Sequence, residues 1–455
     1  MSHDPNVEAL VDAALAQLRE QMLRELADGT ATHGTLDQIE DAVARLGDEF
    51  RRRLQEQIIA ERTRTPRENT LPCPCGGRAR YHLTRERVLI TRHGELRLAR
   101  PYYHCPACRR GFVPLDTALG LDAETTTTQL RGWLAGLSAR LPFPEATQVL
   151  AELTGVQVSV STTTRTALAV GTAVVQAQEA TARQWVQGRQ PPVERKPRRL
   201  YISADGKQVP LREAWKRDGS LGELTCRWGE CKSAVLYEAK AGPKGDEGVV
   251  HRRYLGTLAD CHQFAPQLAV AAHQSGAAFA REVVFLADGA PWLWQIAAAQ
   301  FPRAIQILDY YHASQHLYTV AEARFGEGTA AAKEWVQARQ AELLADRVRA
   351  VLLAMAAWKP KSRTAKQVRR REFRYFRHNA ERMRYGTFRQ QGYQISSGVM
   401  EATCKHVVGQ RLDQAGMHWR PAAATAIVAM RAALLSSNSL DLRSYCRAAT
   451  TLPPS

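Results

Sequence analysis

Residues 281–289 read REVVFLADG, and this stretch decides how most of the chain is interpreted. A short apolar run that ends in Asp288-Gly289 is typical of a buried strand followed by a turn. Two other stretches have the same form, LYISADG at 200–206 and AIQILD at 304–309. The sequence therefore predicts three strands that each end in an aspartate: Asp205, Asp288 and Asp309.

Aspartates at neighbouring strand ends can hold divalent cations, because Mg²⁺ and Mn²⁺ prefer hard oxygen ligands. A further carboxylate is expected from Glu401 in SSGVMEATCKHVVG, residues 396–409. Ser396 or Ser397 would cap a helix whose first turn carries this glutamate. The alternative is an ion pair between Glu401 and Lys405, four residues later, on a solvated helix face.

Three blocks carry a family resemblance: LADGAPWLW at 286–294, FPRAIQILDYYHASQHL at 301–317, and RMRYGTFRQQGYQISSGVMEATCKHVVGQRLDQAGMHW at 382–419. Together they resemble bacterial insertion-sequence transposases of the ISKra type, over residues 66–440. The resemblance implies an RNase H-like fold whose Asp-Asp-Glu triad is interrupted by a helical insertion before the glutamate. The family usually has Gly-Ser-Gly where this chain has Ser396-Ser397-Gly398.

The resemblance assigns the catalytic roles to Asp205, Asp288 and Glu401. These three would hold two Mg²⁺ ions, with Mn²⁺ as an alternative, for metal-dependent cleavage and transesterification of DNA. Asp309 and His312 match the Asp-x-x-His signature of the wider group and are implied beside the site. A buried structural contact between these two residues is the alternative. Trp292 and Trp294 are expected at the mouth of the site or in the core of the following helix.

Residues 359–389 form the most strongly charged segment, with 12 basic and 2 acidic residues. Aromatic residues lie among the cations, which suits a groove that follows a DNA backbone and stacks on exposed bases. A solvated helix face is the alternative. The candidate DNA-binding residues here are Lys366, Arg369, Arg370, Arg371, Arg374, Arg377, Arg382 and Arg384.

Four cysteines form two close pairs, Cys73-x-Cys75 and Cys105-x-x-Cys108, about thirty residues apart. Two such knuckles joined by a hairpin describe a zinc ribbon, in which four thiolates bind one structural Zn²⁺. The alternatives are four unrelated reduced cysteines, or a set in which His82 or His104 replaces one thiolate. The other five cysteines are expected to be core or surface thiols.

Residues 119–186 look helical, and within them residues 142–171 are predicted to form a helix, a turn at Gly155 and a second helix capped by Ser159 or Ser161. The second helix of this helix-turn-helix would present Thr162, Thr163 and Arg165 to DNA. An ordinary helical hairpin is the alternative. A basic, proline-rich stretch at 188–200 reads as a linker, and its Lys196, Arg198 and Arg199 are further candidate DNA contacts.

The N-terminal 62 residues carry 7 basic and 13 acidic residues, whereas the whole 455-residue chain has a net charge of +17. Two amphipathic helices are expected there, the second opened by a capping box of Thr35 and Gln38. The hairpin packs either on its own domain or on a second copy of the chain. The domain layout follows as helical hairpin 1–65, zinc ribbon 66–118, helix-turn-helix region 119–190, RNase H-like core 196–325 and 393–455, and helical insertion with basic segment 326–392.

The excess of basic residues predicts a polyanionic partner, and the hydrophobic content of 45% excludes a fully disordered chain. We expect a cytoplasmic, nucleoid-associated protein without a membrane span or signal peptide. The expected partner is double-stranded DNA, both transposon ends and target, bound by a homo-oligomer that is a dimer on DNA. The expected function is a DNA transposase. The alternatives are a non-catalytic DNA-binding protein derived from one, or a metal-dependent DNA nuclease.

Overall fold

The computed structural model describes residues 5–27, 33–63, 68–215, 221–241, 247–436 and 442–449. The protein is mixed α/β, with two sheets. It divides into two compact units, one made of residues 1–167 and 441–455 and the other of residues 168–440. Within the described part of the chain, no helix combines the length and the apolar composition needed to cross a lipid bilayer.

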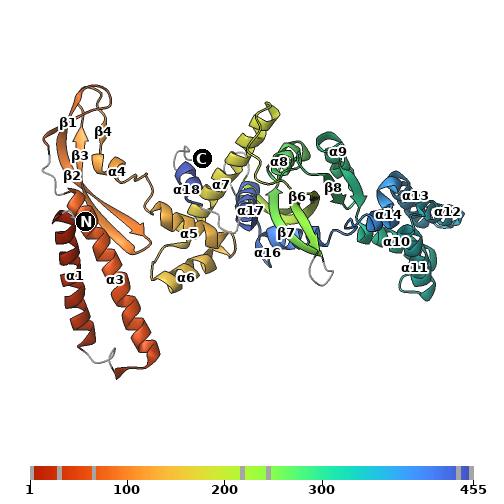
Figure 1. Ribbon diagram of the computed structural model, residues 1–455, viewed down its shortest axis with the longest axis horizontal. Helices are drawn as coiled ribbons and strands as arrows, with labels where there is room; N and C mark the ends of the chain where they lie inside the picture. Colours follow the sequence, from red (N-terminus) through yellow and green to blue (C-terminus); the bar gives the residue numbers. More distant parts are fainter. Residues whose placement is uncertain are drawn as a thin grey trace. The chain divides into compact units, whose positions relative to one another are not determined.

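The first unit begins with two helices that pack side by side, α1 (Pro5–Leu26) and α3 (Leu36–Thr63) (Figure 1). The predicted capping box opens α3, since the Thr35 backbone N–H donates to Gln38 Oε1 at 2.8 Å. The Gln38 backbone N–H in turn reaches Thr35 Oγ1 at 3.5 Å. Two orphan backbone donors are thereby satisfied, and the predicted helical hairpin is confirmed.

A four-stranded antiparallel sheet follows, in the order β1-β2-β3-β4. Its long central hairpin is the predicted one, but the strands extend well beyond the stretches expected from the sequence. The two cysteine knuckles form the turns between the outer strands and this hairpin. The strands are β1 (Thr70–Pro72), β2 (Arg78–Thr91), β3 (Gly94–His104) and β4 (Gly111–Phe112).

The rest of the first unit is helical. Helix α6 ends at Gly155, whose φ of +67° is the left-handed conformation that terminates helices, as the sequence predicted. Helix α18 packs against α5, although it was expected to belong to the catalytic core. The helices are α4 (Pro114–Ala118), α5 (Thr128–Ser138), α6 (Phe143–Thr154), α7 (Val160–Val186), which continues into the second unit, and α18 (Arg443–Ala449).

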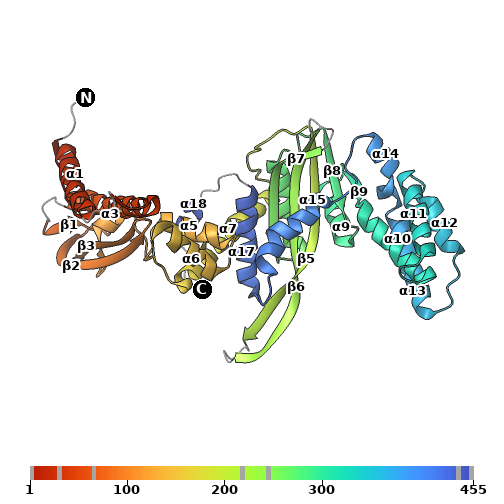
Figure 2. The same ribbon diagram turned by 90° about the horizontal axis from the view of Figure 1, so that it is seen from below.

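The second unit is built on a five-stranded sheet in the order β7-β6-β5-β8-β9. The pairs β5–β6 and β6–β7 are antiparallel, and β5–β8 and β8–β9 are parallel. Figure 2 shows the long β5–β6 hairpin and the strands beside it. The strands are β5 (Arg199–Trp215), β6 (Leu221–Ala241), β7 (Glu247–Thr257), β8 (Glu282–Ala287) and β9 (Ile305–Leu308).

The prediction that the first strand ends at Asp205 was wrong. Strand β5 continues to Trp215, and Asp205 pairs with Ser233 in mid-strand. The reason is visible in the alternation that follows, because Val209 and Leu211 are buried and the pattern of a half-buried strand continues past Asp205-Gly206. What ends at this point is only the parallel pairing to β8, whose last pair is Ser203 with Leu286.

Helices cover both faces of this sheet. Helices α8 (Cys261–Gln274) and α9 (Pro291–Gln300) lie on one face, and the C-terminal helices lie on the other (Figure 1). The C-terminal series carries Glu401 and includes one turn of π-helix, labelled η2. It consists of α15 (Gly398–Thr403), η2 (Cys404–Gly409), α16 (Gln410–Leu412) and α17 (Pro421–Ser436).

The segment between β9 and α15 is helical; the predicted insertion covers its residues 326–392, whereas α10 was expected to belong to the core. Its apolar side chains and those of the sheet form one hydrophobic core, which includes Phe285, Val336 and Phe376. The insertion is therefore fixed to the sheet by packing. Its elements are α10 (Tyr310–Phe325), α11 (Ala330–Leu344), α12 (Val348–Ala357), α13 (Arg363–His378), η1 (Ala380–Met383) and α14 (Tyr385–Gln390).

Candidate functional site

The pairing of three adjacent strands brings the three predicted aspartates to the same end of the sheet. The last β5–β8 pair is Ser203 with Leu286, and the last β8–β9 pair is Ala287 with Leu308. Continuing each pairing places Asp205 beside Asp288, and Asp288 beside Asp309. Residues in register on neighbouring strands point to the same face of a sheet. The strand pairing thus gathers all three aspartates at one edge.

The carboxylates of Asp205 and Asp288 interact electrostatically. Burial raises the pKa of Asp205, and the negative charge of Asp288 raises it further. Local hydrogen bonds hold each carboxylate: Asp205 Oδ1 accepts from the Gly206 backbone N–H at 2.6 Å, and Asp288 Oδ1 accepts from that of Ala290 at 2.9 Å. A cation between the two carboxylates would relieve their repulsion.

Asp309 has a structural role that ties strand β9 to the start of the Glu401 helix. Its side chain is only 1% exposed. Its Oδ1 accepts from the His312 backbone N–H at 2.7 Å and lies 3.2 Å from His312 Nδ1, and its Oδ2 accepts from the Ser397 backbone N–H. Burial alone would raise the pKa of Asp309, but the hydrogen bonds from His312 and Ser397 outweigh burial and lower it.

His312 is held beside the aspartate pair. Its hydrogen bond to Asp309 raises the pKa of the imidazole, and the negative charges of Asp288 and Asp205 raise it further. The ring is partly exposed, at 38% of its side-chain surface, so it can reach a ligand. The geometry therefore combines the two predicted alternatives: Asp309 makes the buried contact, and His312 lies at the surface of the site.

Replacing Asp309 with alanine is expected to lower the free energy of unfolding by about 3 kcal/mol. The substitution leaves two backbone N–H groups, of His312 and Ser397, without their buried acceptor, and each such loss costs roughly 1–3 kcal/mol. Urea denaturation of the second unit measures the effect. Asp309→Asn retains an acceptor oxygen and should lose less than half as much. An alanine variant as stable as wild type would contradict the structural role.

Glu401 lies in the first turn of α15, as predicted, and its side chain is exposed. Ser397 is the N-cap residue, but its hydroxyl makes no capping hydrogen bond. The helix packs on β5 and β6, and Cys404, three residues after Glu401, touches the predicted site. The Cys404 thiol lies 3.5 Å from Asp205 Oδ2 and 3.5 Å from Ser233 Oγ. Helix α15 thus lies against the strand that carries Asp205.

A π-helical turn, η2, begins at Cys404, directly after this contact. Such turns are rare and often occur at functional sites. Neither Cys404 nor Ser233 was predicted as a site residue, because a lone cysteine and a strand serine carry no sequence signal of their own. The spacing of Cys404 from Glu401, one helical turn, was the available clue.

Asp205 and Asp288 offer carboxylate oxygens, the ligand type that Mg²⁺ and Mn²⁺ prefer, and their charges interact. In the described ranges, however, only a set of cysteines brings three or more Asp, Glu, His or Cys side chains close enough together to bind one metal ion. The carboxylate of Glu401 is therefore not grouped with the two aspartates, nor is an ion pair to Lys405 found in these ranges.

The basic segment at 359–389 has two distinct faces. Its cations mostly point outward. Of the aromatic residues expected to stack on DNA bases, Phe376, Tyr385 and Phe388 are buried in the core, so the prediction was wrong for these three. Two of the predicted DNA contacts also turn inward. Arg369 Nη1 donates to the Trp358 carbonyl at 2.8 Å. Arg382 Nε donates to Gln306 Oε1 at 2.8 Å, and its guanidinium lies over the Trp294 ring. The exposed candidates are Lys366, Arg370, Arg371, Arg374, Arg377 and Arg384.

Both tryptophans after Asp288 belong to the core. Trp294 is 7% exposed, and Trp292 packs against the same core and contacts the edge of Phe264. Helix α9 carries both residues with its apolar side toward the sheet. The structure thus favours the core role over the alternative at the mouth of the site.

The helix-turn-helix candidates differ in accessibility. Ser159 is the cap, since its Oγ accepts from the Thr162 backbone N–H at 3.1 Å. Thr163 is fully buried and hydrogen-bonded to Thr147 Oγ1 at 2.8 Å, so it does not present its hydroxyl to DNA. Arg165 is exposed and Thr162 is half-buried. A helix buries every third or fourth residue, which explains why neighbouring threonines differ.

The stretch predicted as a linker packs against helix α8. The Glu194 backbone N–H donates to the Gln274 carbonyl at 2.9 Å, and His273 Nε2 lies 3.0 Å from the Pro191 carbonyl. Lys196 and Arg198 are exposed. Arg199 is engaged within the protein, because its Nε donates to Glu282 Oε2 at 2.8 Å.

The four paired cysteines form a compact candidate metal centre. The Sγ atoms of Cys73, Cys75, Cys105 and Cys108 all lie within 4.8 Å of one another. Each knuckle is closed by backbone hydrogen bonds, Cys73 N–H to the Gly77 carbonyl at 2.8 Å and Cys105 N–H to the Arg110 carbonyl at 2.9 Å. A hydrogen bond from the Cys108 backbone N–H lowers the pKa of the Cys105 thiol, while burial and the neighbouring thiols of the set raise that of Cys73. The set can bind one zinc ion, and neither His82 nor His104 belongs to it.

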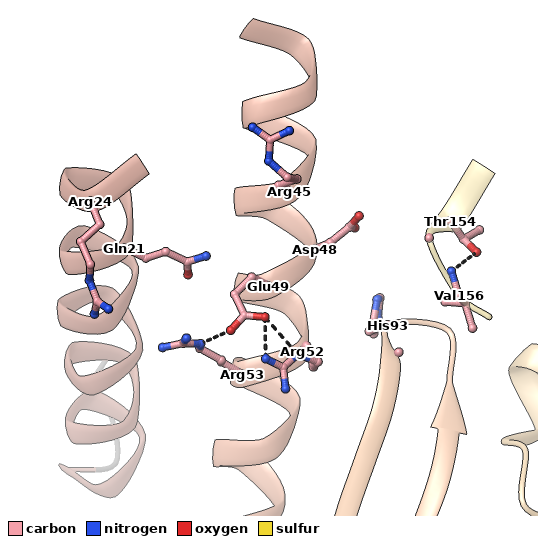
Figure 3. Close-up of a pocket in the computed structure, with 12 residues that line it drawn as sticks. Gln21, Arg24, Arg45, Asp48, Glu49, Arg52, Arg53, His93, Thr154 and Val156 are labelled. Carbon is pink, nitrogen blue, oxygen red and sulfur yellow. Dashed lines mark hydrogen bonds and ion pairs between the residues drawn. The ribbon is translucent and has the colours of Figure 1, made fainter. Parts of the chain in front are cut away.

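A cavity of about 540 Å³ in the first unit carries several arginines (Figure 3). It is lined by the two N-terminal helices, the β2–β3 turn and the end of α6. Glu49 accepts from Arg52 Nη2 at 2.6 Å and also from Arg53, so two of the arginines are balanced by a carboxylate inside the cavity. Arginines paired in this way do not make an anion site.

The chain matches no protein-family model, and no curated protein shows significant similarity to it.

Proposed function

We propose that the protein is a DNA transposase, of the kind that its sequence resembles, with a metal-dependent RNase H-like core. The observation that supports the proposal is the pairing of β5, β8 and β9, whose last parallel pairs come just before Asp205, Asp288 and Asp309. The mixed sheet with helices on both faces, and a Glu-bearing helix against the strand of Asp205, also support it.

In this proposal Asp205 and Asp288 hold the cation, and Glu401 completes the ligand set. A bound divalent ion would supply charge stabilisation for phosphodiester cleavage and for the joining of DNA strands. His312, held by Asp309, would donate a hydrogen bond to a phosphate oxygen at the exposed side of the site. Asp309 itself is fully engaged by His312 and Ser397, so its role is to position these groups.

Exposed cations give the DNA a path to this site. Helix α13 carries its arginines on the outside and leads into the segment before Glu401. Phosphate contacts of this kind supply most of the affinity of a protein for DNA, without sequence preference. Sequence readout would come from the first unit, through Arg165 and Thr162 on α7.

The decisive test is strand transfer. The protein is incubated with Mg²⁺ and DNA that carries the ends of its own flanking element, together with a second, unrelated plasmid. We expect end-specific cleavage and joining of those ends to the plasmid. Cleavage without joining, and without preference for the ends, would indicate a metal-dependent nuclease. Binding without either reaction would indicate a non-catalytic DNA-binding protein, and both outcomes contradict the proposal.

A further inference from the structure

The basic helix α13 reaches the loop that follows β8 through a single hydrogen bond. The Tyr375 hydroxyl donates to the backbone carbonyl of Asp288 at 2.9 Å. Gly289, the next residue, has φ of +103°, and a Cβ there would approach Tyr375 and Leu308 to 2.9 Å. The loop therefore depends on glycine for its conformation. The Tyr375 ring lies too close to Gly289 to leave room for a side chain there.

The Tyr375 ring packs on His316, and His316 in turn contacts a buried carboxylate. The two rings are stacked, with their centroids 3.7 Å apart, and His316 lies on α10. His316 Nδ1 lies 2.5 Å from Glu372 Oε2, and Glu372 is completely buried. A fully buried carboxylate is costly unless it is paired, so this contact fixes the orientation of both helices.

The Glu372 carboxylate also accepts a hydrogen bond from an arginine on the exposed face of α13. Arg371 Nε donates to Glu372 Oε1 at 2.5 Å, while the Arg371 side chain remains 67% exposed. A continuous chain of contacts therefore runs from an exposed arginine, through Glu372, His316 and Tyr375, to the backbone of Asp288. None of these contacts was apparent from the sequence, although Glu372 is one of only two acids among the cations of 359–389.

We propose that α13 is a positioning element, in which Tyr375 fixes the Asp288 loop and a DNA phosphate bound at Arg371 steadies this arrangement. This inference rests on the proposed DNA-dependent function of the same site. Tyr375 acts through Asp288 and is a positioning residue. Its hydroxyl remains protonated, because burial raises the pKa of Tyr375 far above its ordinary value.

The test compares two Tyr→Phe variants that each lose one hydrogen bond to an end of β8. Tyr375→Phe removes the bond to Asp288, just after the strand. Tyr393→Phe removes the bond from the Tyr393 hydroxyl to Glu282 Oε1, 2.9 Å long, at the start of the strand. Hydrogen–deuterium exchange of peptides covering residues 284–292 is measured with and without a random-sequence DNA duplex, and Mn²⁺ affinity is measured by electron paramagnetic resonance.

We expect Tyr375→Phe to speed exchange at 284–292 by about fivefold, the factor that corresponds to one hydrogen bond of roughly 1 kcal/mol. Mn²⁺ affinity should fall by a similar factor, and added DNA should slow exchange in wild type but not in this variant. Affinity for the duplex should be unchanged in both variants. Exchange and Mn²⁺ affinity like those of wild type, or an equal effect of Tyr393→Phe, would overturn the inference. Because exchange needs no DNA cleavage, a protein that fails to cleave can still confirm or refute the coupling.

Discussion

Replacing Asp288 with asparagine is expected to reduce DNA cleavage by at least about a thousandfold, with the fold intact. A ligand carboxylate contributes several kcal/mol of charge stabilisation through its metal ion, and each 1.4 kcal/mol corresponds to a factor of ten in rate. Asparagine retains the Oδ1 acceptor that receives the Ala290 backbone N–H at 2.9 Å, so the loop should keep its conformation. Single-turnover cleavage of the element ends in Mg²⁺ measures the loss.

Asp260→Asn is the matched control. Asp260 also accepts a backbone N–H, from Gln263 at 2.9 Å, where it caps helix α8, and it is not one of the three aligned aspartates. This variant should cleave at the wild-type rate, because asparagine is an equally good helix cap. Equal rates for wild type and Asp288→Asn would reject the catalytic role of Asp288 and with it the proposed metal site.

The alignment of the aspartates was predictable because it depends on local pattern. Apolar runs that end in Asp predicted strands, and parallel neighbours bring their ends to one edge. What the pattern could not give was the register that sets Asp205 beside Asp288. That register depends on which residues of β5 and β8 pair, and pairing is a long-range property of the sheet. The end of β5 was misjudged for a related reason, since its antiparallel partner β6 continues past Asp205-Gly206 and keeps β5 extended there.

The basic segment shows where composition alone misleads. Charge counting correctly indicated an exposed cationic helix, but it treated all residues of 359–389 as one surface. Helix α13 has a buried side, and Glu372, Tyr375 and Phe376 lie toward it. Helical spacing assigns residues to a face, but only the packing partner decides which face is buried. The partner here is α10, whose His316 lies 56 residues before Glu372 in the sequence and had no distinguishing motif.

Glu401 marks the limit of inference from the sequence. Its place in the first turn of a helix was predicted from the preceding serines, and the structure has that helix. Its distance from Asp205 depends on how α15 and the π-helical turn pack on β5 and β6. The spacing of residues along the sequence does not predict this packing. The assignment of Glu401 as a ligand therefore continues to rest on the sequence resemblance, and a Glu401→Gln variant belongs beside Asp288→Asn in the cleavage assay.

Removal of the cysteine ligands is expected to have the largest effect on folding. Replacing Cys105 and Cys108 together with serine should reduce bound zinc from about one ion per chain to none and unfold residues 68–112. The buried apolar cluster around the knuckles consists of Cys73, Ala79, Tyr103 and Cys105, and two of them are thiols of the set. A second cluster, Leu89, Leu96 and Leu98, lies farther along the β2–β3 hairpin. Two clusters this small cannot offset the conformational entropy of residues 68–112 without a metal.

Metal analysis of the purified protein, together with limited proteolysis of residues 68–112, measures both consequences of the double substitution. Cys226→Ser is the control, because Cys226 is an exposed thiol outside the set and its loss should change neither zinc content nor cleavage pattern. The second unit, with its own core, should remain folded in every variant. Full zinc content in the double variant would show that the four thiols are not the ligands. Loss of zinc without increased proteolysis would show that the sheet is stable without the metal.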